Sequence, residues 1–127
     1  MVIVGETGVG KTTLLYSIMG ENIVSKGTSV TKGTIAYVEQ EPFIIQGSVK
    51  ENILFGKQFN QEVFDNALKY SQLIFDVKEF SNGIETTIGA RGSSISGGQK
   101  ARISLARALY SEADIYLFDD PLSAVDP

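Results

Sequence analysis

The stretch that decides the fold spans residues 5–12 and reads Gly5-Glu6-Thr7-Gly8-Val9-Gly10-Lys11-Thr12. It matches the pattern G-x-x-x-x-G-K-[ST] and follows a short β-branched run, Val2–Val4, that we expect to form a strand. A segment with helical character, Lys11–Met19, comes next and stops at Gly20. A strand, a glycine-rich loop and a helix in this order surround phosphate oxygens with backbone N–H groups, because glycine carries no Cβ to obstruct them. The sequence therefore predicts a nucleoside triphosphate site in this segment.

The residue types inside this loop have separate chemical roles. The N-terminus of the following helix adds partial positive charge, which favours an anion. We expect Lys11 to reach the β- and γ-phosphates and the Thr12 hydroxyl to ligate Mg²⁺. A plain glycine turn before an ordinary helix is the alternative, and the motif alone leaves the family open. The predicted phosphate-binding residues are Gly5, Thr7, Gly8, Gly10, Lys11, Thr12 and Thr13.

Composition limits the classes of protein that fit. The sequence has 127 residues, 43% of them apolar and 20% charged, which is typical of one small globular domain and not of a disordered chain. The net charge of −4, without a basic block, gives no support for binding to nucleic acid or to anionic lipid. Cysteine is absent, so disulfides and thiolate metal sites are excluded. No apolar run approaches the roughly 20 residues that a membrane-spanning helix needs.

The rest of the sequence predicts an α/β fold with a mainly helical middle. Ser48 and Glu51 have the spacing of a capping box and should start a short helix that Gly56 ends. Strands as apolar as Ile115–Phe118 are usually buried on both faces, which indicates a parallel sheet flanked by helices. The further predicted elements are a strand at 35–38, helical structure over 60–82, loop over 83–98 and a helix over 99–110.

A second glycine motif precedes the predicted helix over 99–110 and reads Ile95-Ser96-Gly97-Gly98-Gln99. A serine hydroxyl, unobstructed backbone N–H groups and a helix N-terminus together make a second anion-binding end. One nucleoside triphosphate needs only one cradle, so the motif suggests a nucleotide shared with the phosphate loop of another copy. The local alternative is a flexible loop with an N-cap serine.

Two carboxylates end the predicted strand Ile115–Phe118. Asp119 has the position expected for a carboxylate that holds Mg²⁺ directly or through water. Asp120 follows it and points away from its neighbour, where a base could face the attacking water. The alternative is a pair of solvated turn acids before Pro121.

In this order, the motifs resemble the nucleotide-binding domain of ATP-binding-cassette (ABC) ATPases. The corresponding segments are Walker A at 5–12, the Q-loop at Tyr37–Gln40, the signature at 95–99, Walker B at 115–119 and the D-loop at 123–126. The stretches 47–56 and 119–126 narrow the resemblance to the first nucleotide-binding domain of C-subfamily (multidrug-resistance-associated-type) exporters. It implies a P-loop NTPase core with an ABC-type helical subdomain, here incomplete: Walker A and Q-loop core over 1–41, helical subdomain over 42–95, and signature helix, Walker B and D-loop over 96–127.

The resemblance also implies roles for single residues and partners for the chain. Gln40 would contact Mg²⁺ and the attacking water, which makes Lys11, Gln40 and Asp120 the catalytic set and Thr12, Gln40 and Asp119 the metal set. The signature residues Ser96, Gly97, Gly98 and Gln99 would bind the ATP of a second nucleotide-binding domain in a head-to-tail sandwich. The implied function is an ATPase that powers export, attached through transmembrane domains of the same transporter to the cytoplasmic face of a membrane.

The sequence departs from the family pattern at several points. The aromatic residue that stacks on adenine and the switch histidine have no counterpart in the 127 residues, so we expect a piece of a longer protein that is inactive alone. Glu39 stands where proline is usual, Ala90 where exporters have glutamate, and Asp120 where the catalytic glutamate is usual. One alternative is a regulatory module that holds ATP with little or no hydrolysis. Another is a non-transporter ABC ATPase of DNA repair or translation, which the acidic charge and short helical segment disfavour.

Overall fold

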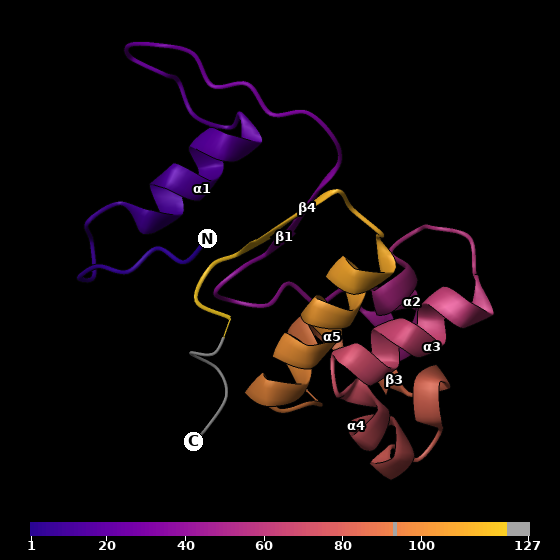
Figure 1. The fold of residues 1–127 in the computed structure, drawn as a ribbon. Helices are drawn as coiled ribbons and strands as arrows, with labels where there is room; N and C mark the ends of the chain where they lie inside the picture. The colour runs from indigo at the N-terminus through magenta and orange to yellow at the C-terminus, as the bar shows by residue number, and fades with distance from the viewer. Residues whose placement is uncertain (93, 122–127) are drawn as a thin grey trace.

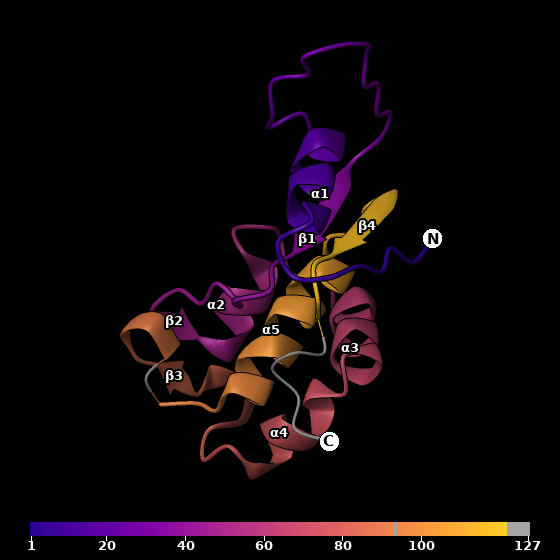
Figure 2. The same cartoon turned by 90° about the vertical axis from the view of Figure 1, so that its left-hand side faces the viewer.

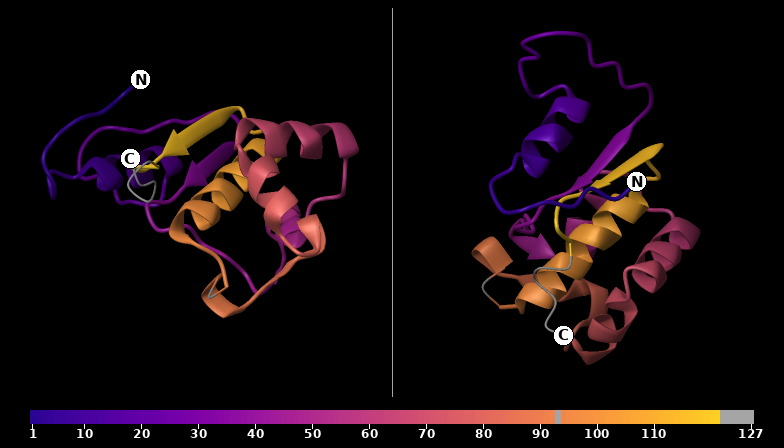
Figure 3. Two further views of the ribbon diagram at one scale, coloured as in Figure 1. Left: turned by 90° about the horizontal axis from the view of Figure 1, so that it is seen from below. Right: turned by 60° about the vertical axis from the view of Figure 1, so that its left-hand side comes forward.

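A computed structural model describes residues 1–92 and 94–121 of the chain (Figure 1). Two parallel strands, β1 (Ile35–Val38) and β4 (Ile115–Phe118), lie between helix α1 (Lys11–Met19) and a group of helices. The same order of layers is visible from two further directions (Figures 2 and 3). The predicted α/β class, with parallel strands flanked by helices, is confirmed. No helix in the described ranges is both long and apolar enough to cross a bilayer.

The pairing of β1 with β4 is fixed at the start of both strands. Ile35 lies opposite Ile115, and the two residues just before them exchange side-chain hydrogen bonds. The backbone N and the hydroxyl of Thr34 donate to Oδ2 of Asp114 at 2.7 and 2.9 Å, and Asp114 N donates to Thr34 Oγ1 at 3.1 Å. These bonds lower the pKa of Asp114. Gly33 has φ 106°, and a Cβ on it would lie 2.8 Å from Asp114 Oδ2, so this close approach requires glycine.

The helical part is built around helix α5 (Gly97–Tyr110), which packs against α2 (Val49–Leu54), α3 (Gln61–Tyr70) and α4 (Leu73–Glu79). A smaller apolar cluster joins α5 to β1 through Ala108. Because α5 contributes to both clusters, it connects the helical part to the strands. The fully buried large apolar side chains of the main cluster are Val49, Ile53, Phe64, Leu73, Ile88 and Ile103.

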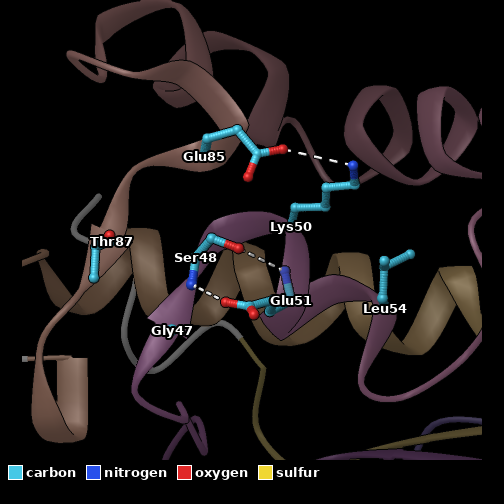
Figure 4. Close-up of a pocket in the computed structure, with 7 residues that line it drawn as sticks. All are labelled: Gly47, Ser48, Lys50, Glu51, Leu54, Glu85 and Thr87. Atoms are coloured by element: carbon cyan, nitrogen blue, oxygen red, sulfur yellow. Dashed lines mark hydrogen bonds and ion pairs between the residues drawn. The ribbon is translucent and has the colours of Figure 1, made fainter.

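The capping box predicted at Ser48 is present and starts α2 (Figure 4). Ser48 Oγ accepts from Glu51 N at 3.0 Å, and Ser48 N donates to Glu51 Oε2 at 2.6 Å. The helix ends where predicted, with Phe55 in the left-handed region followed by Gly56. On the same side, Lys50 Nζ lies 3.5 Å from Glu85 Oε1 and ties α2 to the turn at 83–85.

Two stretches differ locally from their predictions. The helical pattern over 60–82 forms two helices, because Gln72 adopts φ 62° and the buried Ser71 hydroxyl accepts from Leu73 N at 3.4 Å. The predicted loop over 83–98 contains a short antiparallel pair, β2 (Gly47–Ser48) with β3 (Thr87–Ile88). It also contains 3-10 turns at Gly83–Glu85 and Ala90–Gly92, and α5 begins at Gly97 instead of Gln99.

Two expectations about strands are wrong. Val2–Val4 forms no strand, and Val2 and Val4 are each 87% exposed. A strand needs a neighbour for its backbone groups, and no described segment hydrogen-bonds to this run. β4 is half-buried instead of covered on both faces. Its only strand neighbour among the described residues is β1, and β1 carries the ring contact from α1 and the packing of α5.

A buried polar junction holds the loop after β1 against α5. Asn52 is fully buried in α2, and its amide donates to the carbonyls of Ile45 and Ser48, both at 3.0 Å. Its Oδ1 accepts from Ile45 N at 3.0 Å and from Arg107 Nη2 at 3.1 Å. Arg107 of α5 also donates to the carbonyls of Asn52 at 2.8 Å and Phe43 at 2.7 Å. The polar groups of one side chain thus fix residues 43–45, α2 and α5 relative to one another.

This junction makes Asn52→Ala strongly destabilising. The substitution leaves the Ile45 backbone groups and part of the Arg107 guanidinium without their partner, at about 1–3 kcal/mol for each group that stays buried and unpaired. We expect the free energy of unfolding to fall by roughly 2–4 kcal/mol in urea titrations of the full-length protein. Asn66→Ala, on the exposed side of α3, is the matched control and should change it by less than about 0.5 kcal/mol. Equal effects of the two substitutions would contradict the assigned role of Asn52.

Candidate functional site

The glycine loop before α1 is closed around the ammonium group of Lys11. Lys11 Nζ donates to the carbonyl oxygens of Gly5 at 2.8 Å and of Glu6 at 2.9 Å, so the side chain folds back over the loop. Gly8 and Gly10 have φ values of 84° and 97°, which other residues rarely adopt. A Cβ on Gly8 would have open space around it, so the requirement for glycine there is conformational.

The start of α1 is prepared for an anion. Gly10 occupies the N-cap and supplies no side-chain acceptor, and the first turn contains no acidic residue. The N–H groups of this turn have no acceptor within the helix, so the helix N-terminus keeps its donors and partial positive charge. Thr12 is half-buried, and Thr7 and Thr13 are exposed. The donor set therefore fits phosphate, and phosphate binding at this loop stays a prediction.

A second part of the site lies where β1 and β4 end. Both strands run parallel, so Gln40, Asp119 and Asp120 come to the same edge of the sheet. Asp119 is only 7% exposed, and its backbone N donates to Val38 O at 3.0 Å, which continues the ladder. Gln40 and Asp120 are exposed, and Asp120 adopts the left-handed region with φ 46°. Carboxylate, amide and hydroxyl oxygens suit Mg²⁺. The predicted metal set consists of Thr12, Gln40 and Asp119.

Tyr37 contacts the Asp119 side chain, and sequence reasoning gave Tyr37 no role of its own. Its hydroxyl donates to Asp119 Oδ2 at 3.1 Å, and its ring lies 5.8 Å from the ring of Tyr16 in α1. Burial and the Asp119 carboxylate raise the pKa of Tyr37 above its ordinary value, so the hydroxyl keeps its proton. The sequence offered one signal: Tyr37 lies in the predicted strand 35–38, three residues before Gln40. The link across to Asp119 depends on strand register, which the sequence does not state.

The second glycine motif forms the N-terminus of α5 and is capped locally. Ser96 Oγ accepts from Gln99 N at 3.2 Å, and Gln99 Oε1 accepts from Ser96 N at 2.9 Å. Figures 1 and 2 place this end of α5 on the other side of the strands from α1. The two glycine motifs therefore do not meet within one chain. Ser96 is the N-cap, as in the local alternative, although here it begins a formed helix. The role of Ser96, Gly97, Gly98 and Gln99 in binding phosphate stays a prediction.

The positions that depart from the family pattern lie on the surface. Glu39 is exposed at the end of β1, and its charge acts on the Arg107 guanidinium. Ala90 is exposed at the start of a 3-10 turn. The predicted D-loop at 123–126 lies outside the described residues. Within residues 1–92 and 94–121, no group of three or more acidic side chains is arranged to hold a metal ion. A metal here would need other ligands, such as the Thr12 hydroxyl or a nucleotide phosphate.

Comparison with known proteins gives one consistent answer. Over 126 residues the chain is 48% identical to ATP-binding cassette sub-family C member 4 of Homo sapiens, which covers 99% of this chain and 10% of that protein. Metal resistance protein YCF1 of Saccharomyces cerevisiae is 49% identical over 124 residues, 98% of this chain and 8% of that protein. ABC transporter C family member 9 of Arabidopsis thaliana is 50% identical over 126 residues, 99% of this chain and 8% of that protein.

The chain thus spans a tenth or less of the length of these relatives. The family described as ABC transporter matches residues 1–123. These residues include the glycine loop, the end of β1, the capped start of α5 and the acidic end of β4. Since the match covers nearly the whole sequence, the chain belongs to the ABC transporter family.

Proposed function

We propose that this chain is the Mg-ATP-binding part of an ATPase module that drives export by a membrane transporter. The observation that carries the proposal is the closed glycine loop, with Lys11 folded over it and an uncapped α1 N-terminus free of acidic residues. Gly5, Gly8 and Gly10 would admit phosphate oxygens to the backbone, and Lys11 would neutralise them. Mg²⁺ would be held by Thr12, Asp119 and Gln40, and when bound it supplies charge neutralisation at the phosphates.

We further propose that each nucleotide is shared with a second nucleotide-binding domain in a head-to-tail sandwich. The support is spatial: the glycine loop and the α5 N-terminus lie on different sides of the strands in one chain. The glycine loop then needs the signature motif of another module, and the signature motif of this chain needs the glycine loop of that module. Ser96, Gly97, Gly98 and Gln99 would meet the γ-phosphate held by the partner's glycine loop. Transmembrane domains of the same transporter, on the cytoplasmic face of a membrane, complete the proposed assembly.

The relatives support the C-subfamily part of this proposal. We further propose that the chain comes from the first nucleotide-binding domain of such a transporter. The stretches 47–56 and 119–126 carry that finer assignment. We propose that residues 1–41 form the core with Walker A and the Q-loop, and that residues 42–95 form the helical subdomain. Residues 96–127 would contain the signature helix, Walker B and the D-loop. Similarity to C-subfamily transporters over nearly the whole chain argues against a DNA-repair or translation ATPase, and the net charge of −4 argues against nucleic acid.

The binding proposal is tested at Lys11. Lys11→Ala removes a charge-assisted phosphate contact, and we expect the binding free energy of a fluorescent ATP analogue to weaken by about 1.5–3 kcal/mol. The titration uses the full-length protein, with Lys26→Ala in the exposed loop after α1 as the matched control. Equal affinity of wild type and Lys11→Ala would mean that the glycine loop is not the nucleotide site.

A regulatory module with little hydrolysis is the second candidate function, and Asp120 favours it. The carboxylate of aspartate sits roughly 1.5 Å back from the position a glutamate would reach. A misplacement of about 1 Å can lower a rate on the order of 100-fold. Binding should survive, because the glycine loop and Asp119 hold phosphates and metal without Asp120. This module would then occlude ATP for long periods while its partner performs most of the turnover.

Asp120→Glu separates these two functions. In the complete transporter we expect single-site hydrolysis to rise severalfold while ATP affinity stays nearly unchanged. The left-handed φ of 46° at Asp120 suits aspartate better than glutamate and limits the size of the gain. Asp65→Glu on the exposed side of α3 is the control. Unaltered nucleotide trapping and turnover at this site would remove Asp120 from the base position.

The ATPase activity of residues 1–127 by themselves can also be predicted. Because each proposed site is completed by the signature of another module, we expect the isolated segment to release no phosphate steadily. A phosphate-release assay on the purified segment checks this expectation. Steady release by a monodisperse sample, abolished by Lys11→Ala, would contradict it.

A further inference from the structure

We propose that Tyr37 is a positioning residue for the Asp119 carboxylate and thereby sets the affinity of the site for Mg²⁺. The inference rests on the proposed Mg-ATP site. The Tyr37 hydroxyl donates to Asp119 Oδ2 at 3.1 Å, and Asp119 is only 7% exposed. Among the described residues, Asp119 makes no other side-chain hydrogen bond. One carboxylate oxygen is therefore assigned to Tyr37, and Oδ1 is left for a ligand.

The contact follows from strand register. Tyr37 lies opposite Leu117, and Asp119 comes two residues after Leu117, so both side chains lie on the same face of the β1–β4 pair. The backbone bond from Asp119 N to Val38 O extends the ladder by one more step and fixes the distance between the two strand ends. A one-residue slip would move the carboxylate to the opposite face, away from the phenol.

Tyr37 is itself held from the side of α1. Its ring lies 5.8 Å from the ring of Tyr16 with a tilt of 56° between the planes, a favourable arrangement for aromatic pairs. Because α1 begins at Lys11 and Thr12, the Tyr16–Tyr37–Asp119 series connects the helix that follows the phosphate loop with the acidic end of β4. The proposed phosphate ligands and the proposed metal ligand are thus positioned by one chain of contacts.

The chemistry gives the direction of the effect. A carboxylate with one oxygen fixed has lost rotational freedom before a metal arrives, and groups that orient a metal ligand typically change metal affinity by 10–100-fold. Tyr37→Phe keeps the ring and its ring contact with Tyr16, and it removes the hydroxyl that interacts with Asp119 and with the Tyr16 side chain. The loss should therefore fall on metal binding, while phosphate contacts of the glycine loop stay intact.

The test measures nucleotide and metal binding in the full-length protein. A fluorescent ATP analogue is titrated in EDTA, and then at fixed nucleotide over a range of Mg²⁺ concentrations, with Mn²⁺ binding followed by electron paramagnetic resonance. For Tyr37→Phe we expect unchanged affinity in EDTA and a rise of about tenfold in the Mg²⁺ and Mn²⁺ concentrations needed for half-saturation. Tyr116→Phe is the matched control, because this β4 tyrosine lies on the other face of the sheet and stacks on Phe118.

The outcomes separate this inference from the function beneath it. Unchanged metal dependence in Tyr37→Phe, with normal nucleotide binding in wild type, overturns the role of Tyr37 alone. Weaker binding of the analogue in EDTA also overturns it, because the hydroxyl then supports the fold in general. If wild type binds the analogue no better than Lys11→Ala does, the proposed Mg-ATP site fails, and the inference about Tyr37 fails with it.

Discussion

The parallel pairing of β1 with β4 is the constraint on which the site depends. These strands are separated by most of the helical part of the chain, and a parallel pair can form only across such a long connection. Thr34 and Asp114 fix the register where the strands begin, and Tyr37 and Asp119 are brought together where they end. A slip of one residue at the Thr34–Asp114 contact would move the Asp119 side chain to the face opposite Tyr37. The proposed metal-binding edge therefore depends on the Thr34–Asp114 hydrogen bonds at the other end of the strands.

Helix α5 makes the long connection compatible with that register. Its apolar side packs on α2, α3 and α4, while Ala108 packs on β1. Arg107 adds the polar half of the junction by binding Asn52 and the carbonyl of Phe43. The segment that carries Gln40 into the helical part is thus held at residues 43–45, a few residues beyond the strand end. Burial lowers the pKa of Arg107, and its guanidinium lies 4.6 Å from the Phe55 ring.

The sequence predicted most of what is local, and missed what depends on distant neighbours. Sequence patterns predicted α1, β1, β4 and the capping box at Ser48, because each of these depends on residues close together in the sequence. Val2–Val4 was wrong because β-branched residues form a strand only beside a partner, and the described chain offers none. The contact between Tyr37 and Asp119 was not predicted, because its hydrogen bond joins residues separated by 82 positions. Such a contact has no periodic signature in the sequence.

The local bonds of the second glycine motif bear on how a shared nucleotide would bind. Ser96 and Gln99 already satisfy each other's backbone groups, so their side chains are held in place without a ligand. A phosphate arriving from a partner module would meet a formed helix N-terminus, with little further ordering to oppose binding. If Gln99 or Ser96 turned to contact that phosphate, the cap would have to be replaced by the new contact. The α5 N-terminus is therefore formed without a ligand, and the proposed contacts to a γ-phosphate would compete with the two bonds of its cap.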